Sequence, residues 1–289
     1  MEFYHLRSFV VVAETRNLTQ AAKRLCSTPP AISAHIKTLE QELGTDLFIR
    51  STKGMTLTKK GELLLVNAQK TLDSAVDMVN LAADSQDKLM GNFTLAVNQP
   101  LQQLRIPQLL KNLSENCPGI SVQLCQSATG RIFENILLGY FDGGLVYGDV
   151  PEDFFALKIK QEKITTIAPK NFDEKSIISA QNLSDKLWIT MDKYCPFDNE
   201  LTKRLGSNYQ SKAQSNDEQS RLDLVRNDIG LSFLELSLAE QYQKKGEIKI
   251  LPHLDFNIDL SFVVADKRIN DPIIKALIQE IRIVWNITL

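Results

Sequence analysis

The side chains best suited to contact a nucleic acid lie between Thr28 and Thr38. Thr28 is a residue type that caps helices, and Pro29 and Pro30 follow it in the first turn, where a missing N–H removes no helical hydrogen bond. The next apolar residues recur at intervals of three and four and predict one buried helical stripe: Ile32, Ile36, Leu39 and Leu43. The other faces then carry small or hydrogen-bonding side chains: Ala31, Ser33, Ala34, His35, Lys37 and Thr38. Such a helix fits the major groove of duplex DNA.

His35 is the one histidine on this helix that could do chemistry. It would donate a hydrogen bond to a base or a phosphate, or it would merely cover the exposed face. The other two histidines, His5 and His253, are far from it in sequence. The chain contains no G-x-S-x-G, Walker, H-E-x-x-H or paired C-x-x-C motif. We therefore expect no enzymatic activity, no metal and no cofactor.

Two further helices must hold the reading helix in place. The segment Leu18–Leu25 is predicted to form the preceding helix, with Thr19 as its cap and a small apolar face. The apolar spacing within Phe3–Ala13 predicts a first helix that packs beneath both. The three helices together predict a helix-turn-helix with its support.

A wing is predicted to follow. The segments Leu47–Arg50 and Met55–Thr58 have the residue types of two short strands, with a turn at 51–54 between them. Arg50 and Lys53 on this wing would lie near phosphate or an adjacent minor groove. The alternative is that they are two solvated surface charges.

Charge and composition favour a basic head on an acidic body. Residues 1–60 hold nine Lys or Arg against five Asp or Glu, a net +4, whereas the whole chain of 289 residues carries −2, which leaves −6 for the rest. Such an asymmetry suits phosphate binding by the head alone. No apolar run approaches the ~20 residues of a membrane helix, and the N-terminus lacks the signal-peptide pattern. We therefore expect a cytoplasmic protein with no membrane partner.

The four cysteines, at 26, 117, 125 and 195, do not have metal-ligand spacing. We interpret them as reduced thiols. A redox pair of Cys117 with Cys125 is the alternative.

Residues 59–90 are predicted to form one long helix. Its small and apolar residues are spaced three, four, three and four, the pattern of a coiled coil: Leu65, Ala68, Leu72, Ala75 and Val79. This spacing favours pairing with a second chain. The alternative is a helix that lies on its own domain.

From Gly91 onwards the pattern alternates between strand and helix, which predicts a parallel α/β sheet. We expect strands at 93–97, 120–124, 144–147, 164–168, 187–191, 229–234 and 260–264. The expected helices are 100–115, 129–138, 217–226, 236–244 and 272–285.

The N-terminal pattern resembles the signature of the LysR-type transcriptional regulators. The matching residues are Ala21-Ala22-x-x-Leu25, Thr28-x-Pro30-Ala31-Ile32-Ser33-x-x-Ile36-Lys37-x-Leu39-Glu40-x-x-Leu43-Gly44-x-x-Leu47-Phe48-x-Arg50 and Leu57-Thr58-x-x-Gly61. Two departures are Pro29, where the family often has Gln, and Ala34, where it often has Arg or Gln. The family's base contacts therefore cannot all be copied to this chain.

The resemblance implies a fold of class α + α/β. It would comprise a winged helix-turn-helix DNA-binding domain at 1–58, a linker and dimerisation helix at 59–90, and a two-lobed α/β effector domain that resembles periplasmic binding proteins. Lobe I would be 91–161 with 266–289, and lobe II 162–265. DNA contacts are then expected from these residues: Thr28, Pro30, Ala31, Ser33, Ala34, His35, Lys37, Arg50, Lys53 and Thr58.

The implied function is that of a sequence-specific transcriptional regulator controlled by a small-molecule effector. Its partners would be double-stranded promoter DNA, the effector, a second copy in a dimer or tetramer, and RNA polymerase. A transport binding protein is the rival that the α/β lobes alone permit, although the basic head and the missing export signal argue against it.

Effector contacts are expected beyond the carboxyl ends of strands and at helix starts. The candidate residues are Gln99, Pro100, Leu101, Gln102, Ser127, Thr129, Tyr147, Tyr194, Phe197 and Asn216. Backbone N–H groups at helix starts suit a carboxylate, to which Arg131 would add charge unless it is a surface residue. Gln99 and Gln102 stand where the family often has a hydroxyl, which weakens that interpretation. The aromatic residues favour an aromatic or apolar effector, or serve as core packing.

Overall fold

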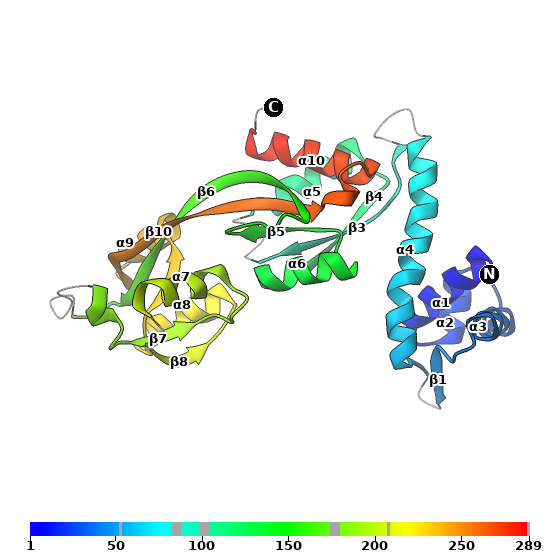
Figure 1. The fold of residues 1–289 in the computed structure, drawn as a ribbon, viewed down its shortest axis with the longest axis horizontal. Coiled ribbons are helices and arrows are strands. Elements are labelled where there is room, and N and C mark those ends of the chain that lie inside the picture. The colour runs from blue at the N-terminus through cyan, green and yellow to red at the C-terminus, as the bar shows by residue number, and fades with distance from the viewer. Residues whose placement is uncertain (52–53, 83–87, 99–103, 174–179, 207–208, 288–289) are drawn as a thin grey trace. The chain divides into compact units, whose positions relative to one another are not determined.

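The computed structural model describes residues 1–51, 54–82, 88–98, 104–173, 180–206 and 209–287 (Figure 1). The chain divides into two units, Met1–Asn92 and Phe93–Leu289, and each is described by itself. Among the described helices, none combines the length and the hydrophobicity that a bilayer crossing requires.

The first unit is a winged helix-turn-helix followed by a long helix. Its elements are α1 (Phe3–Thr15), α2 (Leu18–Arg24), α3 (Pro29–Leu43), the wing strands β1 (Phe48–Ser51) and β2 (Gly54–Leu57), and α4 (Lys59–Leu81). β1 and β2 pair antiparallel, from Phe48 opposite Leu57 to Ser51 opposite Gly54. The predicted head, three helices followed by a two-stranded wing, is therefore confirmed in the type and the order of its elements.

Side-chain caps fix where the helices of this unit begin. Thr28 caps α3 as predicted, since its Oγ1 accepts a hydrogen bond from the Ala31 amide at 3.4 Å. The prediction of Thr19 as the cap of α2 was wrong, because Asn17 Oδ1 accepts from the Thr19 and Gln20 amides at 2.9 and 3.0 Å. The helix therefore begins two residues earlier than a Thr19 cap would allow, and Asn17 satisfies two orphan amides of its first turn.

The core of the first unit lies where α1, α3 and the wing meet. Ile32, Ile36 and Leu39 are almost completely buried there, which confirms the predicted stripe of α3 for these three residues. Leu43, the fourth predicted member, lies in the last turn of α3 and is 38% exposed, so that part of the prediction was wrong. Phe9 of α1 packs edge-on against Phe48 of the wing, with ring centroids 5.5 Å apart.

The long helix α4 is shorter than predicted and uses its apolar residues differently. It ends at Leu81 rather than near residue 90. Ala68 is buried in the core of its own unit, and Leu65 and Leu72 pack against the same core. This packing supports the alternative of a helix on its own domain for that part of α4. Leu65 and Leu72 are only partly buried, so the predicted pairing of this helix with a second chain stays a prediction. Only Val79 of the predicted set is exposed.

The second unit contains a six-stranded sheet in the order β4-β3-β5-β10-β6-β9 and a smaller sheet β7-β8. The strands of the large sheet are β3 (Gly91–Val97), β4 (Ile120–Gln126), β5 (Gly143–Tyr147), β6 (Phe154–Pro169), β9 (Ser232–Glu235) and β10 (Ile248–Ala265). β3 and β5 are parallel, but β10 is antiparallel to both β5 and β6. The large sheet is therefore mixed: the expectation of parallel strands is confirmed for β3 with β5, and for β7 with β8 in the smaller sheet, but it was wrong for β6, β9 and β10.

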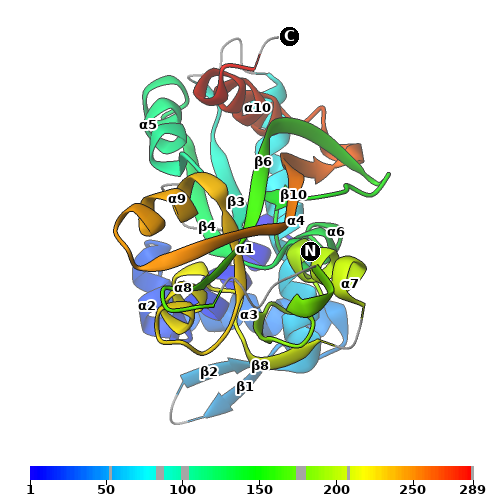
Figure 2. The same ribbon diagram turned by 90° about the vertical axis from the view of Figure 1, so that its left-hand side faces the viewer.

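Two long strands join the lobes of this unit. β6 and β10 run side by side from one lobe to the other (Figures 1 and 2). Leu260–Val264 of β10 pairs with β5 in lobe I, whereas Ile248–Leu251 pairs with the far end of β6 in lobe II. The chain therefore returns to lobe I before residue 260, not at 265 as predicted.

Helices flank each lobe. Lobe I has α5 (Ile106–Asn116), α6 (Thr129–Leu138) and α10 (Pro272–Trp285), of which α5 and α10 pack together and α6 lies on the other side of the sheet (Figure 1). Lobe II has β7 (Leu187–Thr190), β8 (Gln210–Gln214), α7 (Pro196–Leu205), α8 (Glu218–Arg226) and α9 (Leu236–Lys244). The sequence did not predict α7 or β8, and α5 begins at Ile106 rather than at residue 100.

Candidate functional site

The outward face of α3 carries most of the residues expected to meet DNA. Thr28, Pro30, Ala34 and Lys37 are exposed, while Ala31 and Ser33 are half-buried. The opposite face is closed by the buried stripe, so α3 is held rigidly within its unit while these side chains remain at the unit's surface.

A polar network joins α3 to the wing. Arg50 of β1 donates from Nη1 to Ser33 Oγ of α3 at 3.3 Å, and its Nη2 lies 4.0 Å from Glu40 Oε2. Glu40 Oε1 in turn accepts from the Leu47 and Phe48 amides at 2.8 and 3.2 Å. Sequence analysis missed this role of Glu40, although its place in the motif could have indicated it. These contacts hold the wing strand β1 beside α3 and leave the Arg50 side chain exposed at the surface.

His35 turns away from the outward face. Its Nδ1 lies 2.8 Å from Ser8 Oγ of α1, and its ring packs against Tyr4 and His5 with centroids 4.9 and 5.5 Å away. Burial, and secondarily the nearby His5, lowers the pKa of His35, so the neutral imidazole is favoured. This placement argues against the predicted contact with a base or a phosphate and assigns His35 to the α1–α3 contact.

Thr58, another residue of the expected DNA-contacting set, has a structural role in the first unit. The Thr58 hydroxyl donates to the Asp46 carbonyl and accepts from the Gly61 amide, each at 2.9 Å, so it caps α4 and has both roles occupied. Lys53 lies outside the described residues. Of the two expected wing cations, the structure therefore describes Arg50.

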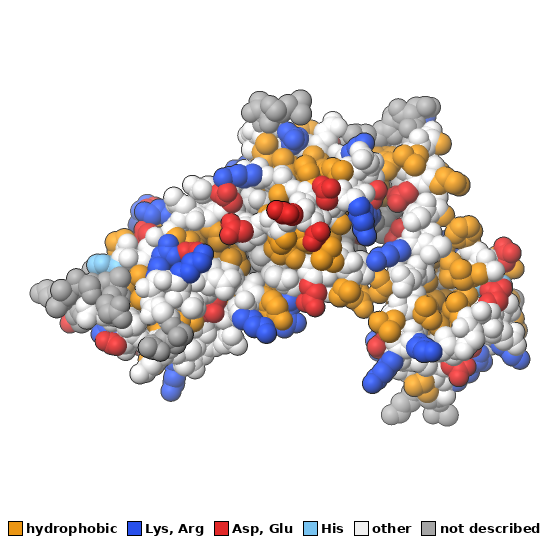
Figure 3. All heavy atoms as spheres, viewed as in Figure 1, with side chains coloured by type: hydrophobic (Ala, Val, Ile, Leu, Met, Phe, Trp, Pro, Cys, Tyr) orange, Lys and Arg blue, Asp and Glu red, His pale blue; other side chains and the backbone are white. Residues whose placement is uncertain are grey.

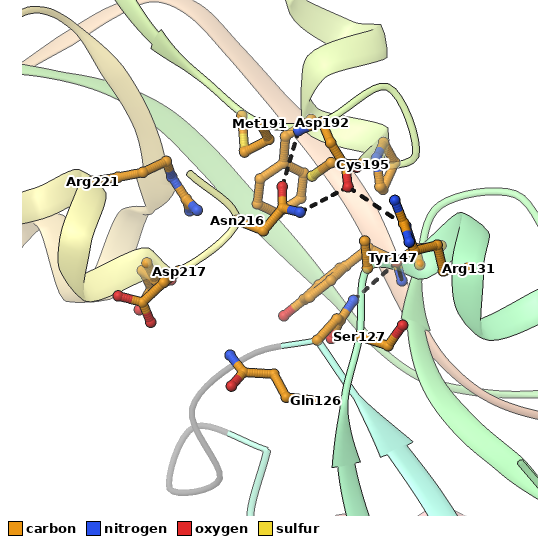
Figure 4. Close-up of a pocket in the computed structure, with 16 residues that line it drawn as sticks. Gln126, Ser127, Arg131, Tyr147, Met191, Asp192, Cys195, Asn216, Asp217 and Arg221 are labelled. Atoms are coloured by element: carbon orange, nitrogen blue, oxygen red, sulfur yellow. Dashed lines mark hydrogen bonds and ion pairs between the residues drawn. The ribbon is translucent and has the colours of Figure 1, made fainter. Parts of the chain in front are cut away.

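A cavity of about 530 Å³ lies between the lobes of the second unit (Figure 4). The expected residues that line it are Ser127, Thr129, Tyr147, Phe197 and Asn216. Tyr194 instead lines a neighbouring cavity of about 450 Å³. The expected residues from Gln99 to Gln102 lie outside the described part of the chain.

Thr129 and Tyr147 build the lobe I wall rather than offering free polar atoms. Thr129 Oγ1 accepts from Asn98 Nδ2 at 3.0 Å and from the Tyr147 amide at 3.3 Å. The Tyr147 hydroxyl donates to Glu162 Oε2 at 2.5 Å, and Lys160 pairs with the same carboxylate. Burial, followed by the charge of Glu162, holds the pKa of Tyr147 well above its usual range, so the phenol stays protonated. Its ring presents an apolar face beside Phe197, with centroids 5.4 Å apart.

The lobe II wall is tied together by Asp192 and Asn216. The Asp192 amide donates to Asn216 Oδ1 at 2.9 Å, and Asn216 Nδ2 donates back to Asp192 Oδ2 at 2.8 Å (Figure 4). Arg131 Nε of lobe I lies 4.0 Å from the same carboxylate oxygen. This contact crosses the cavity, so closing or opening the lobes would change it.

Three further residues of lobe II complete the cavity. Cys195 occupies the N-cap position of α7 without a side-chain capping hydrogen bond, and burial raises the pKa of its thiol, so the neutral form is favoured. Asp217 caps α8, where hydrogen bonds from Ser220 hold the pKa of its carboxyl below the usual range. Arg221 lies one turn further along α8 and is 4% exposed. Sequence analysis did not single out Arg221 or Asp192, because nothing in their spacing distinguishes them from surface charges.

All four cysteines are free thiols, and Cys117 is buried. The described residues contain no cluster of three or more His, Cys, Asp or Glu side chains able to hold a metal ion.

Comparison with known families accounts for both units. Residues 3–62 match the family described as "Bacterial regulatory helix-turn-helix protein, lysR family", and residues 86–285 match the "LysR substrate binding domain". The second match alone covers more than half of the chain. This protein belongs to the LysR family.

Members of the LysR family with the same domain order are similar along most of the chain. The HTH-type transcriptional regulator CysL of Bacillus subtilis (strain 168) is 27% identical over 259 residues, which cover 88% of this chain and 87% of CysL. Full-length OxyR from Pseudomonas aeruginosa, in a variant with one cysteine changed to aspartate, has a TM-score of 0.72 at 22% identity and covers 99% of this chain and 97% of its own. CbnR in complex with its target DNA has a TM-score of 0.65 at 22% identity, over 98% of this chain and all of that one.

As a LysR-type protein, the chain is a DNA-binding transcriptional regulator with a domain that binds small-molecule effectors. Its relatives are regulators and not enzymes. The transport alternative no longer fits, because the α/β lobes and the DNA-binding head belong to one regulatory family.

Proposed function

We propose that this LysR-type regulator reads promoter DNA with the outward face of α3. The proposed sequence-reading residues are Thr28, Pro30, Ala31, Ser33, Ala34 and Lys37, with Arg50 of the wing as a phosphate contact. The observation that carries this proposal is the division of α3 into a face buried against its own unit and a face at the unit's surface. Small side chains there permit close approach to base edges, and the two cations suit phosphates.

The variant Ala34→Glu tests this assignment. Ala34 is exposed and small, so the new carboxylate leaves the core intact and faces the phosphates. We expect loss of binding to an operator fragment, itself mapped by genomic footprinting, in fluorescence anisotropy at moderate salt. Gln108→Glu adds the same charge at an exposed position of α5 and is expected to bind normally. Normal binding by Ala34→Glu would refute the reading face.

We also propose that two chains pair through the C-terminal part of α4. Large apolar side chains are exposed on this part of the helix: Met78, Val79 and Leu81. Figure 3 shows hydrophobic side chains at the surface over α4. Water contact with such residues is unfavourable, and covering them with a second copy would remove it. Two heads would then read two half-sites of one operator.

The effector is proposed to act from the cavity between the lobes. Its walls come from both lobes, and the Arg131–Asp192 contact crosses it. A ligand that binds one separation of the lobes better than another shifts the population toward that separation. We propose that this shift changes the spacing of the paired heads in the cytoplasm and, with it, contact with RNA polymerase at the promoter. Transcription with purified polymerase, with and without effector, tests that last step.

A further inference from the structure

One buried cation in the interlobe cavity forms no ion pair with the described residues. Arg221 projects from α8 into the cavity (Figure 4) and is 4% exposed. Its Nη1 donates to the Ser215 carbonyl oxygen at 3.3 Å, and its Nε is buried without any hydrogen-bond acceptor. Among the described residues, no carboxylate forms an ion pair with this guanidinium.

Two of the nearby acidic groups are engaged elsewhere. Asp217 Oδ2 accepts from the Ser220 amide at 2.7 Å and from the Ser220 hydroxyl at 2.6 Å. The Asp192 carboxylate accepts from Asn216 and faces Arg131. Glu218 sits one turn before Arg221 on α8 and interacts with it electrostatically. The cation is thus only partly balanced by the protein.

An arginine in this environment is costly unless something pairs with it. Burial withdraws the guanidinium from water, and this lowers the pKa of Arg221 from its usual value. Arginine nevertheless stays protonated in proteins, so the site keeps a positive charge. Its remaining N–H groups form a planar fork that matches a carboxylate or phosphate.

We propose that the effector of this regulator carries an anionic oxygen group, a carboxylate or a phosphate, that lies against Arg221. The apolar part of the same molecule then packs on the wall formed by Tyr147, Phe197 and Met191, all of which line the cavity. This inference rests on the proposed function, because it takes the interlobe cavity as the effector site.

Bromide provides a test that does not depend on knowing the effector. Crystals of the full-length protein soaked in sodium bromide are expected to show an anomalous peak against the Arg221 guanidinium, and crystals of Arg221→Gln are expected to lack it. Arg131→Gln is the matched control, because Arg131 lines the same cavity but is 58% exposed, and the peak should persist in it. No peak at Arg221 in the unmodified protein would overturn the proposal.

Calorimetry on the full-length protein then tests organic anions against their neutral isosteres. The probes are phenylacetate with phenylacetamide, succinate with succinamide, and inorganic phosphate. At least one anion is expected to bind more tightly than its amide, and Arg221→Gln should weaken that binding at least about tenfold, the ratio that one charge-assisted hydrogen bond supports. Arg221→Lys, which keeps the charge but loses the fork, should recover part of the affinity.

The outcomes separate this inference from the proposed function. Ser127→Trp fills the cavity from lobe I. If an amide binds as well as its acid, and Ser127→Trp abolishes both, the cavity is the effector site but the anion inference is wrong. If an anion binds equally well to Ser127→Trp and to Arg221→Gln, it binds elsewhere and both proposals fail. Operator binding measured in parallel shows that each variant is folded.

Discussion

Removal of Arg50 from the wing should change how operator binding depends on salt. Its side chain is 51% exposed, it lies beside the reading helix through Ser33, and Glu40 at 4.0 Å neutralises it only in part. A cation that neutralises one phosphate releases condensed counterions, which adds about 0.9 to the slope of log K against log salt. Arg50→Met should therefore reduce the slope by ~0.9 for each head and by ~1.8 for a pair of heads.

The expected size of the effect follows from that slope. A rise from about 50 to about 200 mM salt lowers the operator-binding constant of both proteins. When two heads bind, the factor by which the constant falls should be roughly 12 times smaller for Arg50→Met than for the unmodified protein. The assay is fluorescence anisotropy with a labelled operator at four or more salt concentrations. Lys111→Met, which removes an exposed cation from α5, should leave the slope unchanged.

An unchanged slope for Arg50→Met would refute the phosphate contact. A weaker affinity with the same slope would instead indicate that Arg50 acts only by holding Ser33 in place. Equal changes in slope for Arg50→Met and Lys111→Met would show that the effect is one of total charge and not of the wing.

Three further outcomes follow from the first unit. Thr58→Ala should lower the stability of α4 by ~1–2 kcal/mol, measured by amide hydrogen exchange, because the Gly61 amide loses its cap, while operator binding of the folded variant stays normal. The pKa of His35 in the folded protein lies below its usual 6.5, so the unfolded chain binds more protons than the folded one. The stability that comes from neutral His35 is therefore complete above pH 6.5 and is lost as the pH falls through the folded pKa. Thermal unfolding between about pH 5 and about pH 8 should show that dependence, and His35→Gln should flatten it. Met78→Asp should give monomers in sedimentation, whereas Ser74→Asp, at an exposed polar position of α4, should not; an unchanged mass for Met78→Asp would contradict pairing through α4.

The sequence by itself determined the local elements of the head. The three-and-four spacing of Ile32, Ile36 and Leu39 defines which face of α3 is buried, because a helix brings such residues onto one side whatever surrounds it. The Thr28 cap of α3 was predictable for a similarly local reason, since a capping side chain accepts a hydrogen bond from an amide only two or three residues away. The wing strands and the final helix were predictable on the same grounds.

Only the tertiary structure decided what the remaining faces contact. The spacing of Leu65, Ala68 and Leu72 is the same whether the helix packs on a second chain or on its own core, so periodicity could not choose between them. The sequence could not determine the direction of the strands either, because a buried antiparallel strand such as β10 contains the same apolar residue types as a buried parallel strand.

The interlobe cavity shows most clearly what only the tertiary structure decides. Arg221 and Asp192 are far apart along the chain and look like ordinary surface charges in the sequence. Packing within lobe II brings them to one wall of the cavity, and the two crossings through β6 and β10 place the lobe I wall opposite them. Strand ends and helix starts pointed to five residues that line the cavity, but the burial of a charge is set by long-range packing. No local pattern therefore distinguished Arg221 and Asp192 from solvated surface charges.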